Sequence, residues 1–361
     1  MVILGFILNS CHVARFFWWN FADINDGEKF YSVPVRKANQ PFVFNTGGNS
    51  VDILAPVSLS PIGHPISFDQ LLQKNKTVSF LVIRNDSILY EKYFKDYTNA
   101  SAIPSFSVSK SFVSALIGIA IDEGSIKSVD QKVTDFLPDL KDPGFASISV
   151  SDLLNMRSGI KFAESYGNPF AAMPRFYYGT NLMKMIRKLK TKDHPDKYYD
   201  YQSVNTILLT LILEKATGVP ANVYLQEKIW KPLGMEADAS WNVDNKKNLV
   251  IKSNCCINAH TRDFARFGRL YLNKGNWEGH QIISSDWIRE TLSITNDSRD
   301  SQGYPYKYHW RVMPDGQMFA KGILGQYIYI NPEKQVIIIR LGSATGDIHW
   351  IKLFQEICNH L

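Results

Sequence analysis

A chain of 361 residues, of which 45% are hydrophobic and 20% charged, is long and apolar enough to bury a large core in one domain or two. This composition excludes a largely disordered protein. The formal net charge is +6, but no run of five or six lysines or arginines is present, so we expect no nucleic-acid binding. The four cysteines make no disulfide framework, and Cys255 and Cys256 are adjacent rather than spaced like a zinc-binding Cys-x-x-Cys pair. We expect neither a metal nor a cofactor.

The first eleven residues are apolar and end in Leu-Asn-Ser-Cys, which resembles the end of a bacterial lipoprotein signal that is cut before its cysteine. A complete signal has a lysine or arginine before the apolar run, and the lack of one favours a start inside a longer leader. The pattern predicts a lipid anchor at Cys11 and a periplasmic or outer-membrane-anchored protein. The alternative is an ordinary apolar N-terminus on a cytoplasmic protein. No later segment has 18 uninterrupted apolar residues, so we expect no membrane-spanning helix.

Residues 12–65 are predicted to form an arm or linker, because from about residue 21 they are rich in Pro, Gly, Asn and Ser and show no clear period. Two strand-like runs then flank an Asn-Asp turn and predict a hairpin. They are residues 79–84 and 88–94.

The middle of the chain is mostly helical in its pattern, and strands return near the C-terminus. The clearest helices are expected at residues 150–156, 205–216 and 261–272. Strands are expected at residues 309–312, 317–321, 325–330 and 335–341, followed by a helix from Asp347.

This order predicts one α/β domain over residues 66–361, in the α+β arrangement. Its antiparallel sheet is assembled from residues 66–128 and 300–361, and the helical part is residues 129–299.

The motif that carries chemistry is residues 106–112, FSVSKSF, followed by an apolar run that Asp-Glu-Gly ends at residue 124. Such a run predicts a buried helix. Ser107 and Lys110 are three residues apart and therefore share one face of it. A partly desolvated lysine can take the proton of a serine hydroxyl, and the helix N-terminus favours developing negative charge. This is the Ser-x-x-Lys pair of serine acyl-transfer enzymes.

A second Ser-x-x-Lys match, Ser158 with Lys161, follows the end of a predicted helix and contains a glycine. We interpret it as a helix terminus and loop, in which nothing aims the lysine at the serine. The alternative for Ser107 is a capping serine with an incidental lysine.

Acyl transfer also needs a proton shuttle and an oxyanion hole. Tyr201 lies at a predicted loop-to-helix junction, where its phenol can point into a cleft. Tyr97, Tyr166 and Tyr271 each have an asparagine two residues later, and Tyr201 has Ser203 at that place, so spacing alone does not choose among them. The Ser107 N–H is one candidate oxyanion donor, and the glycine-containing residues 322–326 are the candidate for the other.

Four blocks in order resemble the β-lactamase-related serine hydrolases. This family includes class C β-lactamases, D-alanyl-D-alanine carboxypeptidases, serine esterases and 6-aminohexanoate-dimer hydrolases. The resemblance covers about residues 65–361 and implies the β-lactamase/transpeptidase-like fold, an antiparallel sheet with flanking helices and an all-helical subdomain. The blocks are residues 106–112, 148–159, 201–209 and 325–332.

The resemblance also implies roles for individual residues. Ser107 would be the acylated nucleophile, Lys110 its base and Tyr201 the proton shuttle. The Gln326 N–H would be the second oxyanion donor.

Two positions depart from the family pattern. Ser203 replaces the asparagine of the Tyr-x-Asn element, and Ile323, Leu324 and Gly325 stand in the place of the Lys-Thr-Gly triplet on the strand that lines the cleft. Lys321 lies two residues upstream of the triplet and is a possible substitute for its lysine.

These departures favour a serine hydrolase of esters or small amides, with a small-molecule or short peptide-like substrate. One alternative is a cell-wall D-amino-acid peptidase or weak β-lactamase. Another is a penicillin-binding-type sensor without turnover. The sequence contains no Gly-x-Ser-x-Gly elbow and no His-Glu-x-x-His motif, which disfavours other hydrolase designs.

Overall fold

The computed structural model describes residues 12–19, 21–46, 66–192, 195, 198–294 and 298–361. The predicted signal remnant and its Cys11 lie outside the described residues. Within these ranges no helix is long and apolar enough to cross a membrane.

The two ends of the chain build one antiparallel sheet, as the sequence predicts. It has seven strands in the order β3-β2-β13-β12-β11-β10-β9. The junction between the chain halves is the pairing of β2 with β13, in which Ile83 lies opposite Ile337 and Leu81 opposite Ile339. The strands are β2 (Thr77–Arg84), β3 (Ser87–Tyr93), β9 (Tyr306–Lys307), β10 (Trp310–Val312), β11 (Met318–Gly322), β12 (Gln326–Asn331) and β13 (Val336–Gly342).

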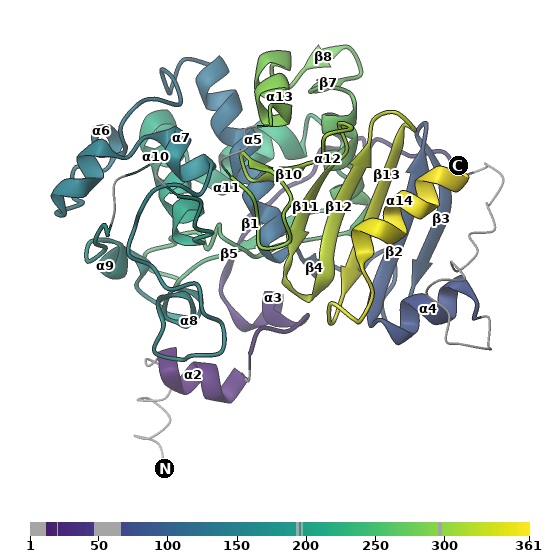
Figure 1. The fold of residues 1–361 in the computed structure, drawn as a ribbon, viewed down its shortest axis with the longest axis horizontal. Coiled ribbons are helices and arrows are strands. Elements are labelled where there is room, and N and C mark those ends of the chain that lie inside the picture. Colours follow the sequence, from purple (N-terminus) through teal and green to yellow (C-terminus); the bar gives the residue numbers. More distant parts are fainter. Residues whose placement is uncertain (1–11, 20, 47–65, 193–194, 196–197, 295–297) are drawn as a thin grey trace.

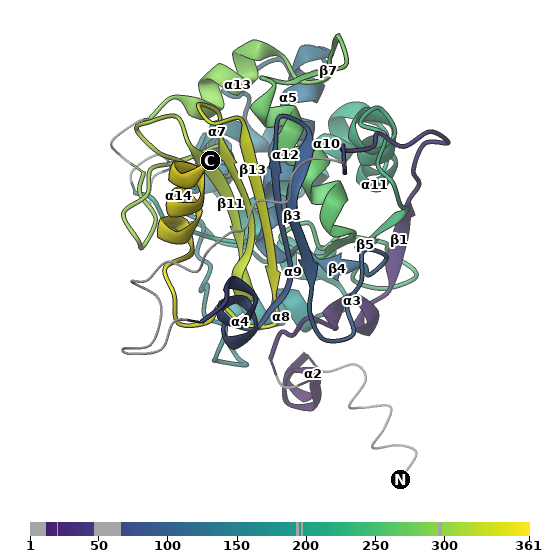
Figure 2. The same cartoon turned by 90° about the vertical axis from the view of Figure 1, so that its right-hand side faces the viewer.

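Helices cover both faces of this sheet (Figures 1 and 2). Alternate residues of β2 point to opposite faces, so Leu81 and Ile83 belong to one apolar cluster while Phe80 and Val82 belong to the other. The helix α12 (Thr261–Leu272) packs on the first face. On the second face lie α4 (Phe68–Lys74) and α14 (Trp350–His360).

The predicted hairpin and helices agree with the observed elements. Asn85 and Asp86 connect β2 to β3 with φ values of 49° and 58°, as a tight hairpin turn requires. The observed α12 has the predicted bounds. The central helices are α5 (Ser109–Asp122), α6 (Val133–Phe136), α7 (Val150–Leu154), α8 (Ala172–Tyr178), α9 (Leu182–Ile186), α10 (Val204–Thr217), α11 (Ala221–Leu225) and α13 (Ser285–Leu292).

The structure adds short strands to the mostly helical middle of the chain, and it places regular elements in the arm that was expected to be irregular. A second sheet has the order β1-β5-β6-β4, and β1 belongs to the predicted arm. These strands have only two to four residues, which is too short for an alternating pattern to appear in the sequence. The arm contains α2 (His12–Trp19), α3 (Asp26–Lys29) and β1 (Ser32–Val35). The other short strands are β4 (Ile103–Pro104), β5 (Ala239–Asn242), β6 (Ile257–Ala259), β7 (Asn276–Trp277) and β8 (His280–Gln281).

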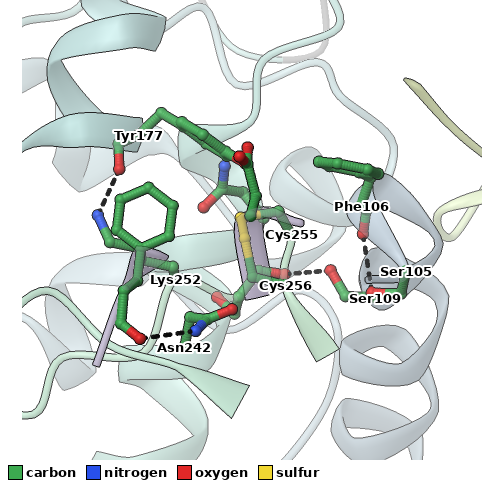
Figure 3. Close-up of a disulfide and its surroundings, with 12 residues drawn as sticks. Ser105, Phe106, Ser109, Tyr177, Asn242, Lys252, Cys255 and Cys256 are labelled. Atoms are coloured by element: carbon green, nitrogen blue, oxygen red, sulfur yellow. Dashed lines mark hydrogen bonds between the residues drawn. A yellow bond between two sulfur atoms is a disulfide. The ribbon is translucent and has the colours of Figure 1, made fainter. Parts of the chain in front are cut away.

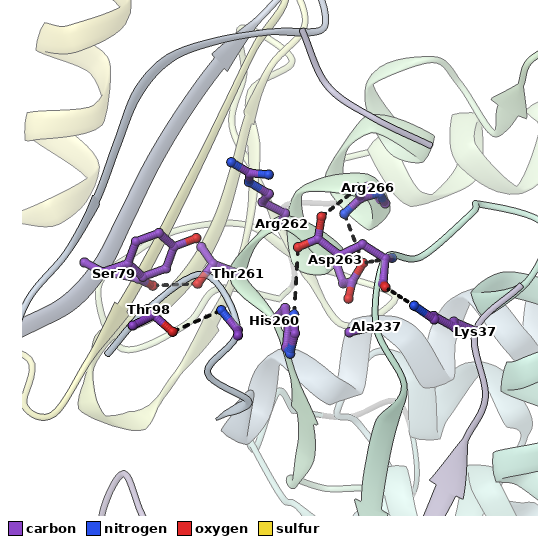
Figure 4. A network of polar contacts seen from close by, with 12 residues as sticks. Lys37, Ser79, Thr98, Ala237, His260, Thr261, Arg262, Asp263 and Arg266 are labelled. Carbon is purple, nitrogen blue, oxygen red and sulfur yellow. Dashed lines mark hydrogen bonds and ion pairs between the residues drawn. The ribbon is translucent and has the colours of Figure 1, made fainter. Parts of the chain in front are cut away.

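Polar contacts fix the N-terminal end of α12 between the two sheets (Figure 4). The Thr261 hydroxyl donates to Ser79 Oγ on β2 at 2.8 Å. Arg266 pairs with Asp263 and with Glu236, each at 3.0 Å. Burial raises the pKa of Asp263 to about 6, although the Arg266 charge acts in the opposite direction.

The helix α5 runs through the core, and residues 109–120 of it are all buried. Its Gly118 lies against the Trp287 ring of α13, where an added Cβ would come within 2.6 Å of ring atoms. Only glycine permits this approach, so the contact sets the distance between α5 and α13.

We therefore expect Gly118→Ala to destabilise the protein. Ala normally stabilises a helix interior by about 1 kcal/mol relative to Gly, but the clash with a buried ring should reverse the sign and cost about 1–3 kcal/mol. Urea unfolding of the variant measures the free-energy change. Gly167→Ala is the matched control, since a Cβ there meets no atom within 4 Å. Equal midpoints for the two variants would contradict this account.

Candidate active site

Ser107 lies in a single 3₁₀ turn, η2 (Phe106–Val108), that leads directly into α5. The preceding residue, Phe106, has φ +43°, which is unfavourable for a side chain of this size. The Ser105 N–H donates to the Ile257 carbonyl at 2.8 Å, and the Ile257 N–H donates to Ser105 Oγ at 3.1 Å. These contacts between β4 and β6 hold the strained turn and so fix the Ser107 hydroxyl.

Lys110 lies one turn after Ser107, as the spacing predicts. Its Nζ donates to Ser107 Oγ at 2.9 Å and to the Asn254 carbonyl at 2.6 Å. The side chain is only 1% exposed. A buried amine needs such acceptors, because unsatisfied burial is costly.

The acceptor for Lys110 belongs to a short loop that contains a disulfide between the adjacent Cys255 and Cys256 (Figure 3). Ser109 Oγ donates to the Ser253 carbonyl at 2.8 Å, so the loop holds the start of α5 at a second point. Trp241 Nε1 donates to the Cys255 carbonyl at 3.1 Å. The sequence argument excluded a disulfide framework and did not consider a bond between the two neighbours.

Tyr201 lies beside the Ser107–Lys110 pair. Lys110 Nζ is 5.2 Å from the centre of its ring. The ring also contacts Tyr306 at a centroid distance of 6.2 Å, and Tyr306 contacts Tyr199 at 5.3 Å. Burial raises the pKa of both Tyr199 and Tyr306 above the usual tyrosine value. The structure thus gathers Ser107, Lys110 and Tyr201 from two segments far apart in the chain.

Ser203 does not line the cavity but holds a residue that does. Its hydroxyl donates to Glu164 Oε1 at 2.6 Å, and its N–H donates to Glu164 Oε2 at 2.8 Å. The Tyr166 hydroxyl donates to the same carboxylate at 2.7 Å. Sequence reasoning missed Glu164, because no motif marks an isolated loop carboxylate.

The second Ser-x-x-Lys match has a different environment. Ser158 is buried, and its hydroxyl donates to Asn205 Oδ1 at 2.7 Å. Lys161 is exposed. Ser158 therefore connects the segment after α7 to α10 through this hydrogen bond.

A cavity of about 700 Å³ lies over Ser107. Acidic and basic groups both contribute to its walls. Arg311 Nε pairs with Asp300 at 2.5 Å, and Lys321 Nζ donates to Gln302 Oε1 at 2.6 Å. Burial and the nearby Arg311 charge lower the pKa of Lys321. The lining residues are Ser107, Glu164, Tyr166, Tyr199, Asp200, Tyr201, Arg299, Asp300, Ser301, Arg311, Lys321, Gly322, Ile323, Leu324 and Thr345.

The end of β11 lies directly against the Ser107 turn. A Cβ at Gly322 would lie 2.7 Å from the Ser105 carbonyl oxygen and 3.1 Å from the Ser107 nitrogen. The triplet of Ile323, Leu324 and Gly325 was predicted to lie on a strand, and this is wrong. It forms a tight turn between β11 and β12, in which Leu324 and Gly325 take the left-handed φ values of 62° and 79°.

Gln326 is fully buried and does not line the cavity. Its side-chain amide donates to the Pro104 and Gly342 carbonyls at 3.3 and 3.2 Å, and its Oε1 accepts from the Gly342 N–H at 2.7 Å. The side chain thus braces the start of β12. The role of its backbone N–H stays a prediction.

Arg340 on β13 holds the turn from behind. Its Nη1 donates to the Leu324 and Gly325 carbonyls, each at 2.7 Å, and its Nη2 donates to the Asn75 and Ala344 carbonyls at 2.7 and 2.9 Å. The guanidinium also lies 4.2 Å from the Trp350 ring centre. Sequence reasoning missed this residue, which reads as one polar position in an apolar strand.

His309 is buried behind Lys110. Its Nε2 lies 3.2 Å from Thr206 Oγ1, and its Nδ1 lies 3.3 Å from the Tyr306 hydroxyl. Burial, with a further effect of the Lys110 charge, lowers the pKa of His309 well below 6.5. The ring is therefore neutral in the folded protein.

Among the described residues no three His, Cys, Asp or Glu side chains are grouped so that they could hold a metal ion. The groups available at the cavity are a hydroxyl, an amine, phenols, backbone N–H groups, and the carboxylates and guanidinium groups of its walls.

The chain is similar to known proteins of one family. The family model for beta-lactamase matches residues 68–348. The 6-aminohexanoate-dimer hydrolase of Paenarthrobacter ureafaciens is 27% identical over 308 residues, which are 78% of this chain and 77% of that protein. A D-alanyl-D-alanine carboxypeptidase of Escherichia coli, itself named as putative, is 26% identical over 113 residues, 29% of this chain and 26% of the relative.

Solved structures share the fold. A "Putative 6-aminohexanoate-dimer hydrolase from Bacillus anthracis" superposes with a TM-score of 0.83 at 22% identity, over 95% of this chain and 93% of that one. A class C beta-lactamase superposes with a TM-score of 0.62 at 19% identity, over 81% and 94% of the two chains.

We predict that Arg340→Lys lowers kcat on the order of 10²-fold with a smaller change in KM. Lysine keeps the charge, but its three donors cannot hold four carbonyls in one plane, so the turn at the cavity should shift. Steady-state ester kinetics and thermal melting of the same samples measure both effects. Arg262→Lys is the control. Arg262 forms an ion pair with Glu91 on β3, so this variant also replaces a paired arginine but leaves the turn at residues 323–325 unchanged. An unchanged kcat in folded Arg340→Lys would refute the positioning role.

The buried neutral His309 predicts a specific loss of stability in acid. Below pH 6.5 the unfolded chain binds a proton at this residue that the folded protein excludes, so the free energy of unfolding falls as the pH falls. The slope should exceed that of His309→Gln by up to about 1.4 kcal/mol per pH unit. Urea unfolding of both proteins between pH 7 and pH 5 measures the difference. Parallel profiles would show that His309 takes up the proton in the folded state.

Proposed function

Since the chain belongs to the beta-lactamase family and is a serine hydrolase of the amidase or esterase type, we propose that it cleaves small esters and amides through an acyl-enzyme on Ser107. The observation that carries this proposal is the 2.9 Å hydrogen bond between Lys110 Nζ and Ser107 Oγ at the base of the 700 Å³ cavity.

In the first step Lys110 acts in its uncharged form: Ser107 Oγ attacks the substrate carbonyl carbon, and the hydroxyl proton passes to the electron pair of Lys110 Nζ. The Asn254 carbonyl, 2.6 Å from Nζ, keeps the amine aimed at the hydroxyl and accepts a hydrogen bond from it throughout. A positioned base of this kind typically contributes 10²- to 10⁴-fold to the rate.

The oxyanion that forms needs two N–H donors. The Ser107 N–H is one. For the other we favour the Ile323 N–H over that of Gln326, because Gly322 lies against Ser107 and Ile323 is the next residue, in the cavity wall. Gly322 permits this approach because it lacks a side chain.

Breakdown of the intermediate requires a proton at the leaving atom. Tyr201, with Lys110 5.2 Å from its ring centre, is placed to relay the proton from the lysine. Water then attacks the carbonyl carbon of the acyl-enzyme and gives a proton to Lys110 and Tyr201. The bond to Ser107 Oγ breaks, the proton returns to Oγ, and the acid is released. No metal or cofactor takes part in these steps.

Esters and small amides are preferred over penicillin-like substrates in this proposal. Ile323 and Leu324 offer no charged or hydroxyl group where penicillin-recognising relatives hold a carboxylate. Lys321 does reach the cavity, but its amine is engaged with Gln302 at 2.6 Å.

Ser107→Ala should abolish turnover of a p-nitrophenyl ester, with a loss on the order of 10⁴-fold or more, and should prevent labelling by a fluorophosphonate probe. Intact mass and absorbance assays measure both. Ser158→Ala is the matched control and should keep labelling and turnover near wild type, provided that it folds.

The outcomes separate the candidate functions. Labelling of Ser107 without ester turnover would favour a sensor that acylates once. Labelling that persists in Ser107→Ala would reject the site itself.

A further inference from the structure

A second cavity, of about 280 Å³, adjoins the catalytic one. Tyr166 and Ile323 belong to the walls of both cavities. The other walls are aromatic or aliphatic and include Met173 and Tyr178 of α8 and Ala22 of the N-terminal arm. Among the described residues no Asp, Glu, Lys or Arg lines it, in contrast to the larger cavity over Ser107.

The walls of this apolar cavity are held in place by buried contacts. The buried Lys252 Nζ donates to the Tyr177 carbonyl at 2.6 Å and to the Gly179 carbonyl at 3.1 Å, which fixes the C-terminal end of α8 (Figure 3). Arg15 Nη1 donates to the Tyr178 carbonyl at 3.1 Å. The Tyr177 hydroxyl donates to Asp26, so the arm is tied to the same helix. A cavity held by its surroundings is ready for a ligand before the ligand arrives.

The position of the cavity relative to the reacting groups indicates which part of a substrate it can reach. The leaving atom must lie near Tyr201 and Lys110, because it receives a proton from them. Tyr199, Asp200 and Tyr201 line the catalytic cavity but not the apolar one. With the carbonyl oxygen directed at the Ser107 and Ile323 N–H groups, the substituent that remains is the acyl chain.

We infer that the apolar cavity binds the acyl chain of the substrate, and that the preferred substrates carry an uncharged, medium-length aliphatic acyl group. This inference rests on the hydrolase function proposed above. The volume corresponds to about nine waters in the liquid, which an entering chain would displace. A charged chain end would be disfavoured there, since no lining side chain carries an opposite charge.

The test is a series of p-nitrophenyl esters from acetate to octanoate, with the leaving group constant. In the wild type kcat/KM should rise about two- to fourfold for each methylene added until the cavity is full. The acetate rate serves as the internal reference for the catalytic groups. A parallel series of alkyl acetates, measured by release of acid, reports on the leaving-group side.

Two variants change the size of the cavity without touching Ser107, Lys110 or Tyr201. Ala22→Leu fills it from the arm and should lower the hexanoate-to-acetate ratio of kcat/KM at least about tenfold. Met173→Ala enlarges it and should move the best substrate to a longer chain. Ala146→Leu, at an exposed alanine that lines neither cavity, should keep the wild-type ratio.

The results distinguish this inference from the function it rests on. If no ester is turned over and Ser107 is not labelled, the proposed function fails. If acetate is turned over but wild-type kcat/KM is independent of acyl length, only the acyl cavity is rejected. A dependence on alcohol length that Ala22→Leu removes would overturn the acyl assignment in favour of the leaving group.

Discussion

The buried amine of Lys110 is the constraint on which the rest of the site depends. An amine that is 1% exposed needs acceptors, and here they are Ser107 Oγ and the Asn254 carbonyl. One acceptor lies in the turn that leads into α5, and the other belongs to a loop 144 residues away. The disulfide of adjacent cysteines, the Ser109–Ser253 contact and the Trp241 hydrogen bond all act on that loop or on the helix start beside it. The acceptors that this buried amine requires therefore connect the start of α5 to the second sheet.

The opposite side of the cavity depends on how the two ends of the chain meet. Pairing of β2 with β13 carries β12 and β11 to the place where Gly322 touches the Ser107 turn. The following turn, residues 323–325, connects β11 to β12. Arg340 donates to two of its carbonyls from the buried side. The serine and the turn are thus positioned by separate buried groups, one an amine and one a guanidinium.

The N-terminal arm extends the site beyond the catalytic groups. Its β1 is an edge strand of the second sheet, and Asp26 bonds to Tyr177 of α8. The apolar cavity therefore has one wall from the arm, one from α8 and a boundary with the catalytic cavity at Tyr166 and Ile323. A segment that does not line the larger cavity over Ser107 thus shapes the smaller cavity that adjoins it.

The sequence by itself determined the features that depend on local spacing. A three-residue separation on a helix brings Ser107 and Lys110 together, an Asn-Asp pair makes the β2–β3 turn, and an apolar repeat defines α12 to the residue. Alternation and order along the chain were enough to predict an antiparallel sheet built from both ends and six of its seven strands, but not the two-residue β9.

Tertiary structure alone decided the contacts between distant segments. No sequence motif marks these contacts. They are the Lys110–Asn254 and Ser203–Glu164 hydrogen bonds, the hydrogen bonds of Arg340 to the turn, and the packing of the arm beside α8. Residues 323–325 were expected on a strand but form a turn, in which Gly325 has φ +79° and the Leu324 and Gly325 carbonyls accept hydrogen bonds from Arg340. The physical reason is the same in each case. The sequence shows which polar groups will need a hydrogen-bond partner if they are buried, but only the tertiary structure determines which residue is that partner.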